Sequence, residues 1–217
     1  MLFRSWASLA PLDVAAGAAL VTAMSLKASA GILIPVVLAG LLRAPRRLLA
    51  VLAGMALAAV VLGAASLIAF GPHLPDLGTQ GRLVIAVSLP NLLGLVLGQG
   101  GETDTLRMLL SVALIVAVLA SGLLAWRRRD SLTASGWATL ALLVTLSWVL
   151  PWYVLWLLPM VALSRSRGLR VATLALGAYL ILTWMPLATA MDNKLGFHPS
   201  KTPLGEQHQR IVKELLN

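Results

Sequence analysis

Long apolar segments separated by short polar or basic stretches run through most of the chain. Residues 48–70, 108–126 and 171–191 are almost uniformly apolar. A bilayer core of about 30 Å is crossed by roughly 20 residues of α-helix. The pattern therefore predicts three single transmembrane helices.

A further apolar region, residues 14–42, is interrupted near its centre by Lys27. In one continuous helix Lys27 would lie near mid-bilayer, at a cost of at least about 2.5 to 3.5 kcal/mol. We therefore favour a helical hairpin whose outer tip is residues 27–31. A cleaved signal peptide is another alternative, because Ala28-Ser29-Ala30 resembles a cleavage site. Asp13 ahead of the apolar region and the apolar run directly after the site argue against cleavage.

Residues 132–163 predict a second hairpin. Proline removes a backbone donor and disfavours the helical conformation in the residue before it, so Pro151 predicts a break between two helices. Trp and Tyr collect where a helix meets the membrane–water interface, so Pro151-Trp152-Tyr153 is expected at the tip. A single helix is the alternative, but it would be longer than a bilayer needs and would put two basic clusters on opposite faces.

Residues 71–107 form the longest polar stretch, in which 83–98 is apolar but interrupted by Pro90-Asn91. Neither piece can span a bilayer, so both are expected to be interfacial or re-entrant helices. Four acidic or imidazole groups of this stretch are expected to be solvated: His73, Asp76, Glu102 and Asp104. Residues 192–217 form a tail in which 206–216 predict a short amphipathic helix.

The fold class predicted is all-α: a polytopic transmembrane helix bundle of about seven spans, with residues 1–191 as one membrane domain and 192–217 as an extracytoplasmic tail. The chain is 59% apolar and 12% charged, which excludes ordinary soluble domains. Its net charge of +9 arises largely from basic clusters at the ends of apolar segments, which indicates topology and not nucleic-acid binding. The clusters are Arg43, Arg46 and Arg47; Arg127 to Arg129; and Arg165, Arg167 and Arg170.

Basic loops stay cytoplasmic, so the N terminus is predicted inside and the C terminus outside a bacterial plasma membrane. Cysteine is absent, which excludes disulfides and thiol-based sites. The three histidines show no spacing typical of a metal site, so neither a metal nor another cofactor is expected.

This topology brings the Lys27 tip, the 71–107 loop and the aromatic hairpin to one outer face. Lys27 and Arg82 are candidates for binding a donor phosphate, and Trp152 and Tyr153 are candidates for contacts with a lipid or a sugar. Each has a simpler interpretation. Lys27 could be an anchor at the interface, Arg82 a solvated loop residue, and the two aromatic residues members of an interfacial belt.

The order of several short motifs resembles the later part of bacterial GT-C glycosyltransferases. The likeness is closest to the polyprenyl-phosphate-mannose-dependent mannosyltransferases and the related glycosyltransferase 87 group, and it covers roughly residues 15–165. The motifs are Ser25-Leu26-Lys27-Ala28-Ser29-Ala30-Gly31, Pro35-Val36-Val37, Ser88-Leu89-Pro90, Leu150-Pro151-Trp152-Tyr153-Val154-Leu155-Trp156 and Leu158-Pro159.

The resemblance implies sugar transfer from a polyprenyl phosphate to an acceptor outside the membrane. In such enzymes an acidic residue of the first outer loop acts as general base and a cation stabilises the departing phosphate. Asp13 is the only acid before the first apolar region and is predicted to be cytoplasmic, so the base is assigned to no residue of this chain. We expect an upstream segment or partner chain to supply it, with membrane lipids as surroundings.

A non-enzymatic membrane protein, such as a subunit of a lipid or solute transporter or an assembly scaffold, is the alternative. A transporter of inverted repeats would show internal symmetry and charged groups facing a midplane cavity. The two halves of the sequence show no convincing repeat.

Overall fold

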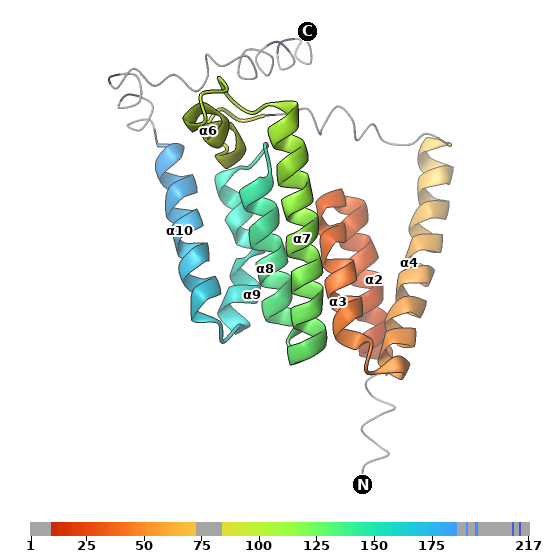
Figure 1. Cartoon of the computed structure of the whole chain (residues 1–217). Helices are drawn as coiled ribbons and strands as arrows, with labels where there is room; N and C mark the ends of the chain where they lie inside the picture. The colour runs from red at the N-terminus through yellow and green to blue at the C-terminus, as the bar shows by residue number, and fades with distance from the viewer. Residues whose placement is uncertain are drawn as a thin grey trace. The chain divides into compact units, whose positions relative to one another are not determined.

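The computed structural model describes residues 10–72 and 84–185, together with a few single residues after them. Throughout these two ranges the regular structure is helical and no strand is present, which confirms the all-α prediction. Figure 1 labels the α-helices. In chain order the elements are α2 (Ala10–Leu26), η1 (Ala28–Ile32), α3 (Leu33–Leu41), α4 (Pro45–Phe70), α6 (Leu89–Val96), α7 (Asp104–Arg128), α8 (Ser131–Thr145), η2 (Pro151–Trp156), α9 (Leu158–Leu163) and α10 (Arg167–Thr183), where η1 and η2 are 3₁₀ helices.

Two of the helices in the described ranges, α4 and α7, are long and apolar enough to cross a membrane. They contain the predicted spans 48–70 and 108–126. Only 17% of the most apolar part of each is buried, although both are apolar on all sides. Large side chains such as Ile68 and Leu119 are exposed, which is the distribution expected of helices that face lipid. The remaining apolar helices are shorter, so the prediction of seven spans is not confirmed.

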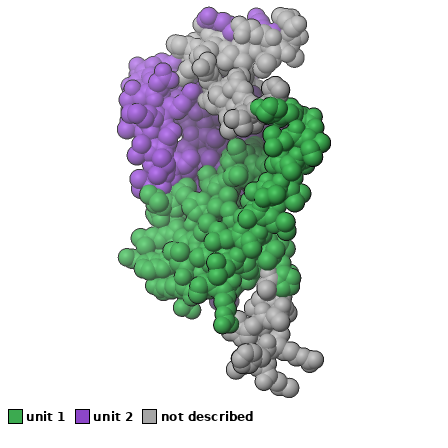
Figure 2. All heavy atoms as spheres, turned by 90° about the vertical axis from the view of Figure 1, so that its right-hand side faces the viewer, with its two compact units in different colours: residues 1–75, 118–135 green, residues 76–117, 136–217 purple. Residues whose placement is uncertain are grey.

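The chain divides into two compact units (Figure 2). Unit 1 comprises residues 1–75 and 118–135, and therefore α2, η1, α3, α4, the end of α7 and the start of α8. Unit 2 comprises residues 76–117 and 136–217, and therefore α6, the start of α7, most of α8, and η2, α9 and α10.

In unit 1 the chain reverses after α2, as the hairpin prediction requires. Lys27 has extended backbone angles, φ −150° and ψ 110°, between the end of α2 and the start of η1. A single helix over residues 14–42 is therefore wrong. Helices α2 and α4 approach at backbone distance, because a Cβ atom on Gly17 would overlap the carbonyl oxygen of Val51 and one on Gly54 that of Val14.

In unit 2, α8 runs toward the 146–150 segment and η2 with α9 returns beside it, since Thr139 of α8 donates a hydrogen bond to the sulfur of Met160 in α9. This confirms the second hairpin but moves its tip. Helix α8 ends at Thr145, and Pro151 begins η2 instead of forming the turn. Proline is tolerated in the first turn of a helix and pushes the preceding residue, here Leu150 with ψ 150°, into the extended region.

Two other predicted boundaries in unit 2 also shift. Pro90-Asn91 was expected to break the apolar stretch, but both residues lie in the first turn of α6, and the side chain of Ser88 caps that helix. Helix α10 starts at Arg167, before the predicted residue 171, because Ser166 caps it. The core of unit 2 includes Leu143 and Leu157, which are fully buried. The predicted helix over residues 206–216 lies outside the described ranges.

Candidate functional site

The segment before α7 folds back over α6 in unit 2. Backbone N–H of Ile85 donates to the carbonyl of Ser147, 2.8 Å away, which ties the start of the segment to the end of α8. After α6 the chain turns through glycines with positive φ, including Gly98 at 73° and Gly101 at 130°, a region that favours glycine. A Cβ atom on Gly94 would overlap the carbonyl of Gly101, so the returning chain lies directly against α6.

Asn91 holds this fold together from a fully buried position. Its Nδ2 donates to the carbonyl of Ala86 at 2.7 Å, and its Oδ1 accepts from the backbone N–H of Glu102 at 3.0 Å. Its own backbone N–H donates to the Oγ of Ser88 at 3.3 Å. The side-chain amide therefore joins the start of α6 to the residue that carries the carboxylate of the site.

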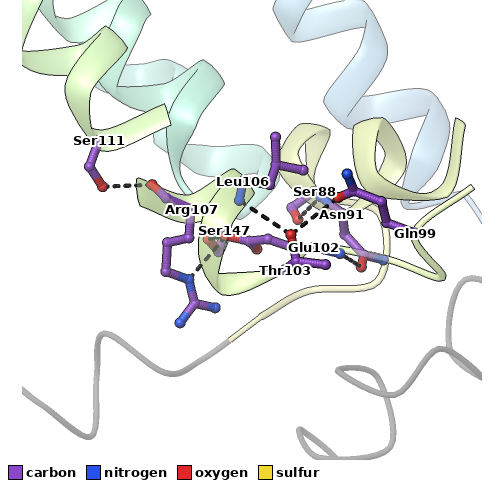
Figure 3. A network of polar contacts seen from close by, with 9 residues as sticks. All are labelled: Ser88, Asn91, Gln99, Glu102, Thr103, Leu106, Arg107, Ser111 and Ser147. Atoms are coloured by element: carbon purple, nitrogen blue, oxygen red, sulfur yellow. Dashed lines mark hydrogen bonds and ion pairs between the residues drawn. The ribbon is translucent and has the colours of Figure 1, made fainter. Parts of the chain in front are cut away.

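Glu102 is a buried carboxylate, although the sequence predicted a solvated one. Its side chain is 1% exposed. Its Oε1 accepts from Arg107 Nε at 3.0 Å and from Ser147 Oγ at 2.6 Å (Figure 3). Its Oε2 is buried and has no hydrogen-bond partner in the described structure. A buried charge is expensive unless it is paired, so the ion pair with Arg107 is central to this arrangement.

Arg107 lies in the first turns of α7 and its side chain is 30% exposed. Glu102 accepts from Nε of this arginine, and the terminal guanidinium nitrogens point away from the carboxylate (Figure 3). A planar guanidinium fixed in this way presents a fork of N–H donors that matches the oxygens of a phosphate. Sequence reasoning missed this residue, and its only local signal was a basic residue five positions after an acid.

The two predicted aromatic contacts differ in their surroundings. Trp152 is 56% exposed and meets the ring of Tyr153 edge-on, with ring centroids 6.5 Å apart. Tyr153 is buried, and its ring stacks on that of Trp156 at 4.3 Å. Tyr153 is thus part of the core of unit 2, while Trp152 presents its ring at the surface.

Of the two predicted phosphate contacts, Lys27 belongs to unit 1, where it is partly buried and precedes η1. Arg82 lies outside the described ranges. The structure thus brings Trp152 and Tyr153 together in unit 2 and describes Lys27 separately from them. Within the described residues, no group of three or more His, Cys, Asp or Glu side chains could hold a metal ion.

Comparison with known proteins links the chain to one family. Residues 84–200, more than half of the sequence, match the family model described as the MptB C-terminal domain. This range begins with the segment that carries Glu102 and Arg107 and continues through α10. Comparison with curated proteins and with solved structures gave no match. MptB is a mycobacterial mannosyltransferase of the GT-C type, so the predicted GT-C relationship is confirmed at the level of the family. The chain belongs to the family of the MptB C-terminal domain, a family of membrane mannosyltransferases.

Proposed function

We propose that this chain forms part of a membrane mannosyltransferase that takes mannose from a polyprenyl phosphate and transfers it to an acceptor outside the membrane. The single observation in the structure that carries the proposal is the pairing of buried Glu102 with Arg107. It fixes a guanidinium group in the family-matched region, with its terminal nitrogens directed away from the carboxylate.

The positive-inside rule supports an outer location for this pair. Arg165, Arg167 and Arg170 lie at the junction of α9 and α10. Further along α10, Tyr179 donates a hydrogen bond to the carbonyl of Val87, in the segment that leads into α6. Helix α10 has 17 residues and is therefore about 25 Å long. If the arginine cluster is cytoplasmic, the Glu102 network lies on the extracytoplasmic side, where the donor sugar would be transferred.

In the proposed reaction an acceptor hydroxyl oxygen forms a bond to the anomeric carbon of mannose as the bond from that carbon to the phosphate oxygen breaks. The hydroxyl proton passes to a general base, which we assign to a segment or partner outside this chain. The leaving polyprenyl phosphate gains negative charge, and Arg107 stabilises it through charge-assisted hydrogen bonds.

Glu102 acts in this proposal as a positioning residue, because it contacts Arg107 and not the donor. Lys27 and Arg82 stay predictions from the sequence as contacts to a donor phosphate. Trp152 is proposed as the contact to the lipid or the sugar, because its ring is exposed, whereas Tyr153 supports it through their edge-on contact.

The test uses membranes from strains of the producing organism in which the gene for this chain is deleted. The gene is then restored as wild type or as a variant. Transfer of labelled mannose from polyprenyl-phosphate mannose is measured. Removal of a donor that stabilises transition-state charge typically lowers kcat about 100-fold or more, and we expect this for Arg107→Met. Glu102→Gln should lower kcat less than Glu102→Ala does, since the amide oxygen of glutamine can still accept a hydrogen bond from Nε of Arg107.

Asp104→Asn is the matched control, because Asp104 is an exposed acid in the first turn of α7, near Arg107 in the sequence. It should leave transfer unchanged. Equal transfer in membranes with and without the chain would contradict the proposal and favour the non-enzymatic alternative. A kcat for Arg107→Met equal to that of the wild type would contradict the role of the guanidinium group.

A further inference from the structure

A cavity of about 370 Å³ lies within unit 1, beside the turn that joins α3 to α4. Three arginines and one aspartate supply the charged part of its lining, and apolar side chains including Val37, Leu41 and Val51 supply the remainder. The charged residues come from four separate places in the sequence: Asp13 in α2, Arg43 in the turn, Arg47 in α4 and Arg129 after α7.

Asp13 and Arg47 neutralise each other. Asp13 is buried, and Nε of Arg47 lies 3.2 and 3.1 Å from its two carboxylate oxygens, while Nη2 lies 2.9 Å from Oδ1. This is the two-pronged geometry that arginine forms with a carboxylate. Asp13, the single acid of the lining, is thus neutralised by Arg47. The charges of Arg43 and Arg129 therefore give the lining a net positive charge.

The two remaining arginines differ in their surroundings. The guanidinium of Arg43 lies over the ring of Trp126, with its central carbon 4.5 Å from the ring centroid, an arrangement stabilised by cation–π attraction. Arg129 has a φ of 55°, which is uncommon for a residue other than glycine and carries a conformational cost. The cavity also adjoins the first turn of α4, where the helix dipole favours an anion.

The position of the cavity indicates which anion it would receive. It lies where α4 begins at Pro45 and where α7 ends at Arg128, and these are the two helices that are long enough to cross a bilayer. The cavity is therefore expected at the level of the lipid headgroups. Its combination of cationic and apolar walls suits a phosphate group attached to an apolar chain.

We propose that this cavity binds the phosphodiester headgroup of an anionic phospholipid, with Arg43 and Arg129 as the phosphate contacts. The Asp13–Arg47 pair shapes the wall of the site. This site is separate from the mannosyl transfer proposed above, and its test measures lipid binding alone, so either proposal can fail without the other.

The test uses the full chain reconstituted in phosphatidylcholine vesicles, to which phosphatidylglycerol is added in increasing amounts. Bound phosphatidylglycerol is measured by native mass spectrometry after extraction. Since a basic residue near an anionic membrane contributes about 1 kcal/mol, we expect Arg43→Gln and Arg129→Gln each to weaken binding about fivefold. The double variant should bind phosphatidylglycerol about 25-fold more weakly than the wild type.

Arg46→Gln is the matched control, since Arg46 lies beside Arg47 in α4 but does not line the cavity. It should retain wild-type affinity. An equal loss with Arg46→Gln would overturn the proposal, because general surface charge would then explain binding. Competition by inorganic phosphate at the same concentration as the lipid would also overturn it, by indicating a soluble ligand.

A second variant tests the cavity without changing charge. Ala16 lines the cavity, so Ala16→Phe should fill part of it and weaken phosphatidylglycerol binding. Wild-type affinity in this variant would overturn the proposed location. Circular dichroism of every variant shows whether the helical content is retained, and Arg43→Lys, which keeps the charge, should restore binding in part.

Discussion

Loss of Arg107 should destabilise unit 2 more than loss of its partner Glu102, although both substitutions break the same ion pair. The reason is the unequal burial of the two side chains, 1% exposed for Glu102 and 30% for Arg107. In Arg107→Met, the carboxylate stays buried without its cation, and only the Ser147 hydroxyl of its two donors remains. Removing one partner of a buried pair in this way costs about 3 to 5 kcal/mol.

In Glu102→Gln, the arginine that remains is partly exposed and can be hydrated, and the new amide oxygen can still accept from Nε. A charge-assisted hydrogen bond is thus replaced by a weaker one to a neutral group, which lowers the free energy of unfolding by about 1 to 2 kcal/mol. The double variant Glu102→Gln/Arg107→Met has no buried charge at this position. It should therefore be more stable than Arg107→Met alone, by about 2 kcal/mol.

The measurement is equilibrium unfolding in mixed micelles, followed by tryptophan fluorescence. Hydrogen exchange of peptides from residues 84–107 provides a local readout of the same effect. Asp104→Asn again serves as the control and should lower stability by no more than about 1 kcal/mol, the usual contribution of an exposed acid in the first turn of a helix. Unequal burial would not explain the result if Glu102→Gln were as destabilising as Arg107→Met. The same holds if the destabilisation of the double variant equalled the sum of the two single destabilisations.

Two further predictions concern packing within each unit. Gly54→Ala should destabilise unit 1 by several kcal/mol, because the added Cβ atom would overlap a carbonyl oxygen of α2. A Cβ atom on Gly63 of the same helix meets nothing within 4 Å. Gly63→Ala should therefore leave the thermal unfolding temperature unchanged or raise it. Tyr179→Phe removes the 2.6 Å hydrogen bond to the carbonyl of Val87. This variant should lower the free energy of unfolding by about 1 kcal/mol and speed amide hydrogen exchange near residue 87. Unchanged hydrogen exchange there would argue against this contact.

The helices of this chain could largely be predicted from sequence because their signals are local. An uninterrupted apolar run predicted α4 and α7, and the cost of a charge inside a span predicted the break at Lys27. The tip of the second hairpin was misplaced by a few residues, since proline both breaks a preceding helix and begins the next. Pro151 took the second role.

The candidate site was harder to predict from the sequence, because its contacts connect distant parts of the chain. The carboxylate of Glu102 is buried against Ser147, 45 residues away. Likewise, Asp13 pairs with Arg47 across 34 residues. A charged residue in a polar stretch is solvated in most proteins, so nothing local indicated that Glu102 would be buried. The order of the short motifs was more informative, since it indicated the GT-C relationship that the family match confirms.

The role of this chain in mannosyl transfer is tested most simply with membranes in which the chain is deleted, restored as wild type, or restored as Arg107→Met. We expect that deletion abolishes transfer from polyprenyl-phosphate mannose, that the wild-type chain restores it, and that Arg107→Met restores about one hundredth of it or less. Undiminished transfer in membranes without the chain would show that the chain is not needed for mannosyl transfer.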